Sequence, residues 1–140
     1  MLLYQLVASD KSISLPSQLG KYKCLLLIER VVEDGFRNQL SRSLVDSGCL
    51  HAMAWGLDCS LWDDSVDYAN IEKFGDGGIP DDQLVMTTWH TDDSLEDVVR
   101  FAKIDAIFSY TDEPLTKLLV LDLRDESRAE VIEELFNRVG

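Results

Sequence analysis

Four apolar runs, each followed by an amphipathic stretch, occupy this chain from residue 22 onward and limit the folds it can adopt. Each run has the length of a strand and is apolar almost throughout, which is typical of strands buried on both faces of a parallel sheet. We expect strands at Tyr22 to Val32, Cys49 to Trp55, Gln83 to Trp89 and Leu115 to Leu123. We expect helices over residues 34–47, 60–74, 95–106 and 127–139, where apolar side chains recur at helical spacing.

Alternation of strand and helix with short connections places the strands in parallel and the helices on both faces of the sheet. The sequence therefore predicts a small doubly wound α/β fold, Rossmann-like or flavodoxin-like, with a mostly parallel sheet of four to five strands. With 140 residues, 46% of them apolar, residues 1–140 are expected to form a single domain. Within residues 1–21, Leu2 to Val7 is a possible edge strand, and Ile13 to Gly20, which contains Pro16, is expected to be a connector.

Local signals mark where the helices should begin and end. A serine followed three residues later by an acid is typical of a capping box, in which the serine oxygen accepts an early backbone N–H. Such pairs are Ser60 with Asp63, Ser94 with Asp97, and Ser127 with Glu130. Gly48 directly follows the first helical stretch and is expected to end it.

Negative charge is concentrated in the middle of the chain. The net charge is −13, and between Gly56 and Asp97 twelve acids stand against a single base, Lys73. A field of this sign repels phosphate, so neither nucleic acid nor an anionic membrane surface is an expected partner. Basic proteins and divalent cations are the natural partners of such a segment.

The N-terminal sequence and the cysteines indicate the compartment. Met1 to Lys11 has no cationic start and only a short apolar run, so we expect neither a secretion signal nor a membrane span, and a cytoplasmic protein. Cys24, Cys49 and Cys59 are an odd number without C-x-x-C spacing, which predicts reduced thiols.

Acidic and aromatic residues of the middle segment form a candidate partner-binding surface. Asp63, Asp64 and Asp67 are expected to share an outward region of one helix with no base to pair with them. A solvated face would normally mix lysines with such acids, so the missing bases favour a cationic partner. Trp62 is expected in the core, and other aromatic side chains are expected to anchor the interface. The candidate residues are Asp58, Asp63, Asp64, Asp67, Trp89, His90, Asp92 and Asp93.

Other interpretations of the same residues remain open. The acids precede helices, where they stabilise N-termini in any α/β protein. Alternatively, His90 is a general base at the carboxyl edge of the sheet, oriented by Asp92 or Asp58, with Trp55 and Trp89 lining a pocket.

Metal, nucleotide and covalent chemistry receive little support from the sequence. Carboxylates such as Asp58 and Asp92 could bind Mg²⁺ or Ca²⁺, but calcium-loop and zinc-ligand spacings are absent, so no metal ligand is assigned. Phosphate-binding glycine motifs are also absent, and no cofactor is expected. Cys59 is surrounded by acids that disfavour its thiolate, and no catalytic residue is assigned.

Two segments carry a resemblance to a known family. CLHAMAWGLDCSLWDDSVDYAN (Cys49 to Asn70) and IPDDQLVMTTWHTDDSLEDVVRFAK (Ile79 to Lys103) resemble an uncharacterised family of small bacterial domains with AWGxDCSxWDDSVDxAN and MTTWH segments. The likeness covers about residues 22 to 125. It implies a bacterial origin and transfers no catalytic residue.

Compactness, acidity and exposed aromatics together predict a binding module for a basic protein. We expect an immunity protein that neutralises a cognate antibacterial nuclease toxin by occluding its active site, because proteins that handle nucleic acid are usually cationic. The alternative is a small enzyme or ligand-binding domain with a rim pocket centred on His90.

Overall fold

A five-stranded sheet forms the centre of the computed structural model, which describes residues 1–11, 13–16, 19–106 and 114–140. The strands are β1 (Leu2–Leu6), β2 (Tyr22–Ile28), β3 (Cys49–Gly56), β4 (Met86–His90) and β5 (Leu118–Leu123). Their spatial order is β1-β5-β2-β3-β4, and every pairing is parallel. The prediction of a doubly wound, flavodoxin-like or Rossmann-like α/β fold is confirmed.

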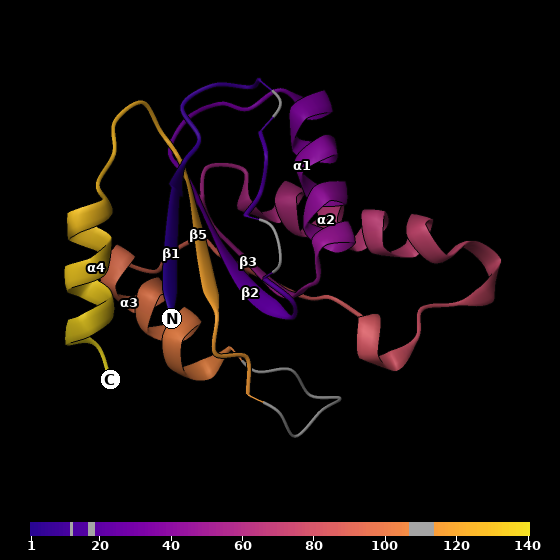
Figure 1. The fold of residues 1–140 in the computed structure, drawn as a ribbon. Helices are drawn as coiled ribbons and strands as arrows, with labels where there is room; N and C mark the ends of the chain where they lie inside the picture. The colour runs from indigo at the N-terminus through magenta and orange to yellow at the C-terminus, as the bar shows by residue number, and fades with distance from the viewer. Residues whose placement is uncertain (12, 17–18, 107–113) are drawn as a thin grey trace.

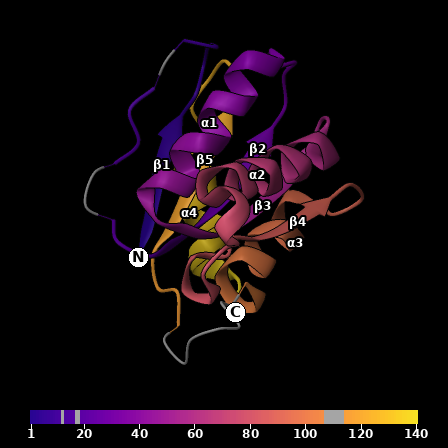
Figure 2. The same ribbon diagram turned by 90° about the vertical axis from the view of Figure 1, so that its right-hand side faces the viewer.

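Helices cover both faces of the sheet (Figures 1 and 2). One face carries α1 (Asp34–Ser47) and α2 (Cys59–Phe74), and the other carries α3 (Leu95–Arg100) and α4 (Ala129–Arg138). A π-helical turn, Phe101–Asp105, extends α3. The loop between α2 and β4 contains two short 3₁₀ turns, Gly75–Gly77 and Asp81–Gln83.

The core lies in two layers on either side of β2, all of whose residues are buried. Side chains alternate across a strand, so Leu26 and Ile28 pack under α1 and α2, while Leu25 and Leu27 pack under α3 and α4. Trp62 lies in the first layer with 1% of its surface exposed, as predicted.

Three strands are shorter than the apolar runs suggested. β2 ends at Ile28 rather than Val32, and just beyond it the Arg30 guanidinium donates to Asp10 and to the Val7 carbonyl. β4 begins at Met86 rather than Gln83, because residues 81–83 form a 3₁₀ turn, and β5 begins at Leu118 rather than Leu115.

The N-terminal strand lies at one edge of the sheet, as predicted. It pairs with β5 and not with β2, the next strand along the chain. The chain runs from β2 through β3 to β4 along one direction of the sheet and returns through α3 to β5, which separates β1 from β2. Residues 17–18 of the predicted connector lie outside the described residues.

Helix ends follow the sequence signals in two places and depart from them in two others. Gly48 ends α1 at a φ of 105°, and the Ser94 hydroxyl accepts from the Asp97 N–H, so both expectations are confirmed. The predicted cap at Ser60 is wrong, because α2 begins at Cys59 after Asp58, which adopts a left-handed conformation. At α4 the cap position is Arg128, and the Ser127 hydroxyl accepts a hydrogen bond from the Ala129 N–H.

All three cysteines are free and buried. Among the described helices, none combines the length and the apolarity that crossing a membrane requires.

Candidate functional site

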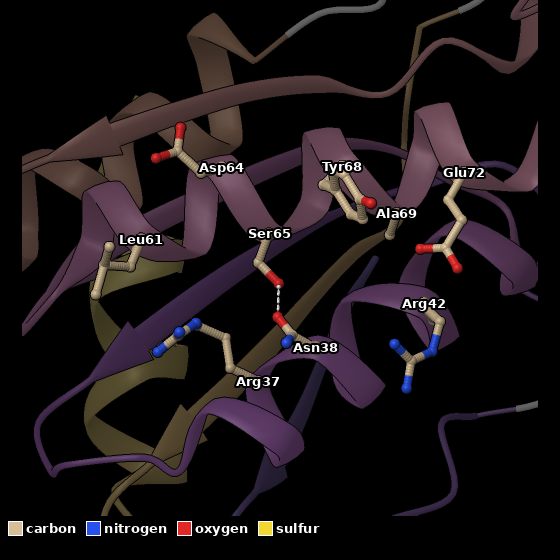
Figure 3. Close-up of a pocket in the computed structure, with 9 residues that line it drawn as sticks. All are labelled: Arg37, Asn38, Arg42, Leu61, Asp64, Ser65, Tyr68, Ala69 and Glu72. Atoms are coloured by element: carbon tan, nitrogen blue, oxygen red, sulfur yellow. Dashed lines mark hydrogen bonds between the residues drawn. The ribbon is translucent and has the colours of Figure 1, made fainter.

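The predicted partner-binding residues lie on α2, on β4 and in the loops at the carboxyl edge of the sheet. Asp58 precedes α2, and Asp92 and Asp93 lie between β4 and α3; all three are exposed. Since parallel strands end at one edge of the sheet, these loop acids share that edge. Asp64 is exposed on the outer side of α2 (Figure 3).

The acids of α2 do not share one outward face, contrary to expectation. Asp64 points to solvent, but Asp63 is only 8% exposed and Asp67 is half-buried. The Thr87 hydroxyl on β4 donates to Oδ1 of Asp67 at 2.8 Å. Asp63 and Asp67, one helical turn apart, therefore belong to the flank of α2 that packs on the edge strand β4.

Most acids of the middle segment have no basic partner. Asp93 pairs with His90, Glu96 with Arg138 and Asp97 with Arg100. The single base of the segment, Lys73, is directed to Asp46 on α1 at 3.7 Å, outside the segment. Within the described part of the chain, the other nine acids form no ion pair: Asp58, Asp63, Asp64, Asp67, Glu72, Asp76, Asp81, Asp82 and Asp92. The negative potential of this segment is therefore largely uncompensated.

His90 and Trp89, predicted to act together, point to opposite faces of the sheet. His90 is 10% exposed, with Nδ1 2.8 Å from Oδ2 of Asp93 and Nε2 3.0 Å from Oγ1 of Thr88. Its ring packs against Phe101 at 4.7 Å between centroids. Trp89 is 53% exposed on the α2 side. Trp89 is therefore available to a partner, whereas His90 is covered.

The acid that orients His90 is Asp93, and neither Asp92 nor Asp58 does so. The same residue accepts, through its backbone carbonyl, a hydrogen bond of 2.7 Å from Nε1 of Trp55. Asp93 thus fixes the β4–α3 loop to two aromatic rings at the carboxyl edge. Sequence reasoning placed Trp55 and His90 at this rim but did not identify the loop residue that joins them.

Burial and repulsion between negative charges raise the pKa values of Asp63 and Asp67, the two acids of α2 that are at least partly buried. Burial raises the pKa of Asp63, the nearby Thr87 hydroxyl opposes that rise, and the negative charges of Asp67 and Asp64 add to it. Burial and the charge of Asp64 likewise raise the pKa of Asp67, against the hydrogen bond that Asp67 accepts from Thr87. Oδ1 of Asp63 is buried and accepts no hydrogen bond from the described residues. The folded protein therefore holds these carboxylates less favourably than water would.

We expect the Asp63→Asn variant to be more stable than wild type at pH 7, by about 1 kcal/mol, because it removes an under-solvated charge. The raised pKa means that ionised Asp63 lowers stability above its folded pKa. The penalty disappears as the pH falls to the ordinary value of 3.8, and the difference between the proteins should disappear with it. Urea unfolding at pH 7 and pH 3.5 measures this, with exposed Asp64→Asn as a control; a less stable Asp63→Asn protein at pH 7 would contradict it.

A groove between α1 and α2 has a volume of about 380 Å³ (Figure 3). Arg37 and Arg42 line its α1 side, and Asp64 and Glu72 line its α2 side. A hydrogen bond of 2.9 Å from the Ser65 hydroxyl to Oδ1 of Asn38 joins the two helices. Charges of both signs therefore line this groove.

Exposed apolar side chains accompany the acids on the outer surface of α2. Leu61 is 45% exposed, Tyr68 69% and Ile71 58%. With Trp89, they give this side of the molecule large side chains of the kind that anchor protein interfaces. Leu61 and Ile71 were not identified from the sequence as exposed residues. Their absence from the apolar stripe of Trp62, Val66 and Ala69 could have indicated that they are exposed.

A second polar cluster at the carboxyl edge is fully partnered. Asp122 on β5 is 0% exposed and accepts two hydrogen bonds of 2.9 Å from Nε and Nη2 of Arg128. The Tyr4 hydroxyl donates to the same carboxylate at 2.7 Å, and Glu29 also contacts Arg128. Because both carboxylates pair with the one guanidinium of Arg128, this cluster ties β1, β5 and the segments after β2 and before α4 together.

Comparison with known proteins gives a family without an activity. Residues 2–139 match the model of a family described as a domain of unknown function, DUF7684. No curated protein and no solved structure matches the chain.

Proposed function

This chain belongs to the DUF7684 family, whose description assigns no activity, and we propose from its surface that it binds and neutralises a basic protein. The partner we propose is an antibacterial nuclease toxin, for which this chain is the cognate immunity protein. The observation that carries the proposal is the set of nine middle-segment acids without an ion pair in the described structure.

Uncompensated charge of this kind favours encounter with a cationic surface. Charges on two partners steer their association over about a Debye length, roughly 8 Å at physiological salt. A nuclease must attract phosphate, so its cleft presents basic side chains to an inhibitor. Carboxylates on and beside α2 can occupy such a cleft in place of the phosphates.

Specific affinity requires apolar contact in addition to charge. Trp89, Tyr68, Leu61 and Ile71 are each more than 40% exposed beside the acids. Aromatic side chains that become fully desolvated contribute most of the energy of many interfaces, while rim charges set the association rate. The two kinds of side chain together match what a tight, fast inhibitor needs.

We expect the association rate with the captured basic partner to fall about tenfold or more between 50 and 500 mM NaCl. Asp64→Lys should reduce it by about tenfold at low salt, since this exposed charge reversal repels the partner. Glu133→Lys is the matched control, because Glu133 is exposed on α4, on the opposite face of the sheet. Stopped-flow or surface-based kinetics measures the rates.

The same protein preparation tests the neutralisation itself. The captured partner should degrade nucleic acid, and one equivalent of wild-type chain should abolish that activity. An association rate independent of salt, or equal losses for Asp64→Lys and Glu133→Lys, would contradict the proposal.

The alternative function is that of a small enzyme or ligand-binding domain at the carboxyl edge. The observation that favours it is the inward-facing His90, hydrogen-bonded to Asp93 beside Trp55. A small molecule that shifts the NMR signals of His90 and Trp55 and leaves those of α2 unchanged would support this alternative over the inhibitor.

A further inference from the structure

Three oxygen-bearing side chains, Asp63, Asp67 and Thr87, meet where α2 packs on the edge strand β4. We call them the α2–β4 oxygen cluster. Asp63 and Asp67 are one helical turn apart, and the Thr87 hydroxyl interacts with both carboxylates. Unlike the acids of the loops, these two are held at fixed positions by regular secondary structure, which favours a defined binding geometry.

The cluster has fewer hydrogen-bond donors than its carboxylates need. A threonine hydroxyl carries one proton, and that of Thr87 is given to Oδ1 of Asp67 at 2.8 Å. Asp63 is only 8% exposed. Its Oδ1 atom is shielded from water and accepts no hydrogen bond from the described residues. A buried carboxylate oxygen without a donor is costly, so an external cation would be bound favourably here.

Each carboxylate also has one oxygen left for a ligand. Oδ2 of Asp63 and Oδ2 of Asp67 have no hydrogen bond within the described residues, and neither is among the buried unpaired atoms. These two oxygens and the lone pairs of the Thr87 hydroxyl come from a helix and a strand. A ligand with three diverging donors can therefore contact all three side chains.

The chemistry of the cluster discriminates among cations. A guanidinium binds best to both oxygens of one carboxylate, but here one oxygen of each is already engaged or shielded. Among the described residues there is no group of three or more histidine, cysteine or acidic side chains able to hold a metal ion. An ammonium group has three N–H donors and a compact charge, which fits the cluster.

The register of α2 on β4 brings an aromatic side chain to this position. The Asn70 side chain accepts a hydrogen bond from the Val85 N–H, and the Asp67 side chain accepts one from the Thr87 hydroxyl. Moving back about one turn along α2 therefore corresponds to moving forward two residues along the neighbouring strand. Trp89 is two residues beyond Thr87 on β4, so it lies on the same face of the strand as Thr87, and it is 53% exposed. An indole beside two carboxylates can cover the methylene stem of a lysine and contact its ammonium group.

We propose that the α2–β4 oxygen cluster, with Trp89 beside it, is a subsite for a lysine side chain of the partner. This inference rests on the proposed function for the origin of the lysine. It adds that one defined cation, rather than the overall negative field, anchors the complex.

The test uses fluorescein-labelled deca-lysine and deca-arginine as probes of equal charge, with binding followed by anisotropy at 100 mM NaCl. Asp63→Asn and Asp67→Asn should each weaken deca-lysine binding about tenfold and deca-arginine binding about twofold. Asp82→Asn is the matched control, since it removes one exposed, unpaired charge from the α2–β4 loop and should weaken both probes about twofold or less. Melting temperatures establish that all variants are folded.

Equal losses for Asp63→Asn and Asp82→Asn, or equal losses for the two probes, would overturn the subsite. Displacement of deca-lysine by 1 mM MgCl₂ at constant ionic strength would identify a divalent-metal site and would also overturn it. The assay contains no natural partner, so its outcome is separate from that of the proposed function. A lysine-selective loss without capture of any basic protein would retain the subsite and refute the immunity function. Capture and neutralisation of a basic nuclease without a lysine-selective loss would retain the immunity function and refute the subsite.

Discussion

Replacing Asp122 by alanine is expected to lower the free energy of unfolding by about 3–5 kcal/mol, a large part of the stability of a small domain. The variant leaves the guanidinium of Arg128 with Glu29 alone, and the Tyr4 hydroxyl without its acceptor. The cost arises because charges taken out of water must be paired where they are buried. Urea unfolding followed by circular dichroism measures the change.

The control for this variant is Asp125→Ala, which removes an exposed carboxylate from the loop after β5. Its free energy of unfolding should stay within about 0.5 kcal/mol of wild type. If both variants unfold at the same urea concentration as wild type, the buried cluster does not hold β1, β5 and α4 together as described.

Replacing Gly56 by alanine is expected to cost about 3 kcal/mol, through backbone strain and overlap. Gly56 ends β3 at a φ of 100°, which favours glycine, and an added Cβ would lie 2.3 Å from the carbonyl oxygen of Ile28. That oxygen accepts a hydrogen bond of 2.9 Å from the Leu57 N–H. Because both contacts are backbone, no side-chain rotation can relieve them, and the ends of β2 and β3 must move apart.

Gly35→Ala provides the contrasting case. Gly35 lies in the first turn of α1, and an added Cβ would meet nothing within 4 Å. Alanine there should raise stability by about 0.5 kcal/mol, since it restricts the unfolded chain and favours the helix. A cost for Gly35→Ala similar to that of Gly56→Ala would show that the close approach at Ile28 is not the cause.

The order of elements could be predicted from hydrophobic patterns, but their neighbours in space could not. Apolar runs identified β2 to β5, and helical spacing with Gly48 located α1 at Asp34–Ser47. The insertion of β5 between β1 and β2 depends on long-range pairing, which leaves no local signal in Leu2–Leu6. The cap predicted at Ser60 failed because Asp58 turns the chain through a left-handed conformation and α2 begins earlier.

The candidate site was predicted in composition and not in geometry. The acids of the middle segment do lack basic partners in the described structure, but Asp63 is buried and His90 faces the other side of the sheet from Trp89. Helical spacing alone could have paired Asp63 with Asp67 and Asn70 along one flank. It could not reveal Thr87 as their neighbour, since that contact depends on how α2 crosses β4.

Stability and binding are expected to oppose each other at Asp63. The same under-solvated carboxylate that makes Asp63→Asn more stable at neutral pH would, in our proposal, receive the lysine of a partner. A residue kept only for the fold would show both properties decreasing together. Measuring both on one variant therefore separates a functional from a structural role.

The position of β1 beside β5 has a consequence for synthesis on the ribosome. β1 is made first, yet its only strand neighbour in the described structure is β5, with Leu2 opposite Leu118. Until β5 has been synthesised and has emerged, the nascent N-terminal segment lacks the strand that it joins in the described structure. Closure of this edge must therefore come after β5 is available, however early the central strands assemble.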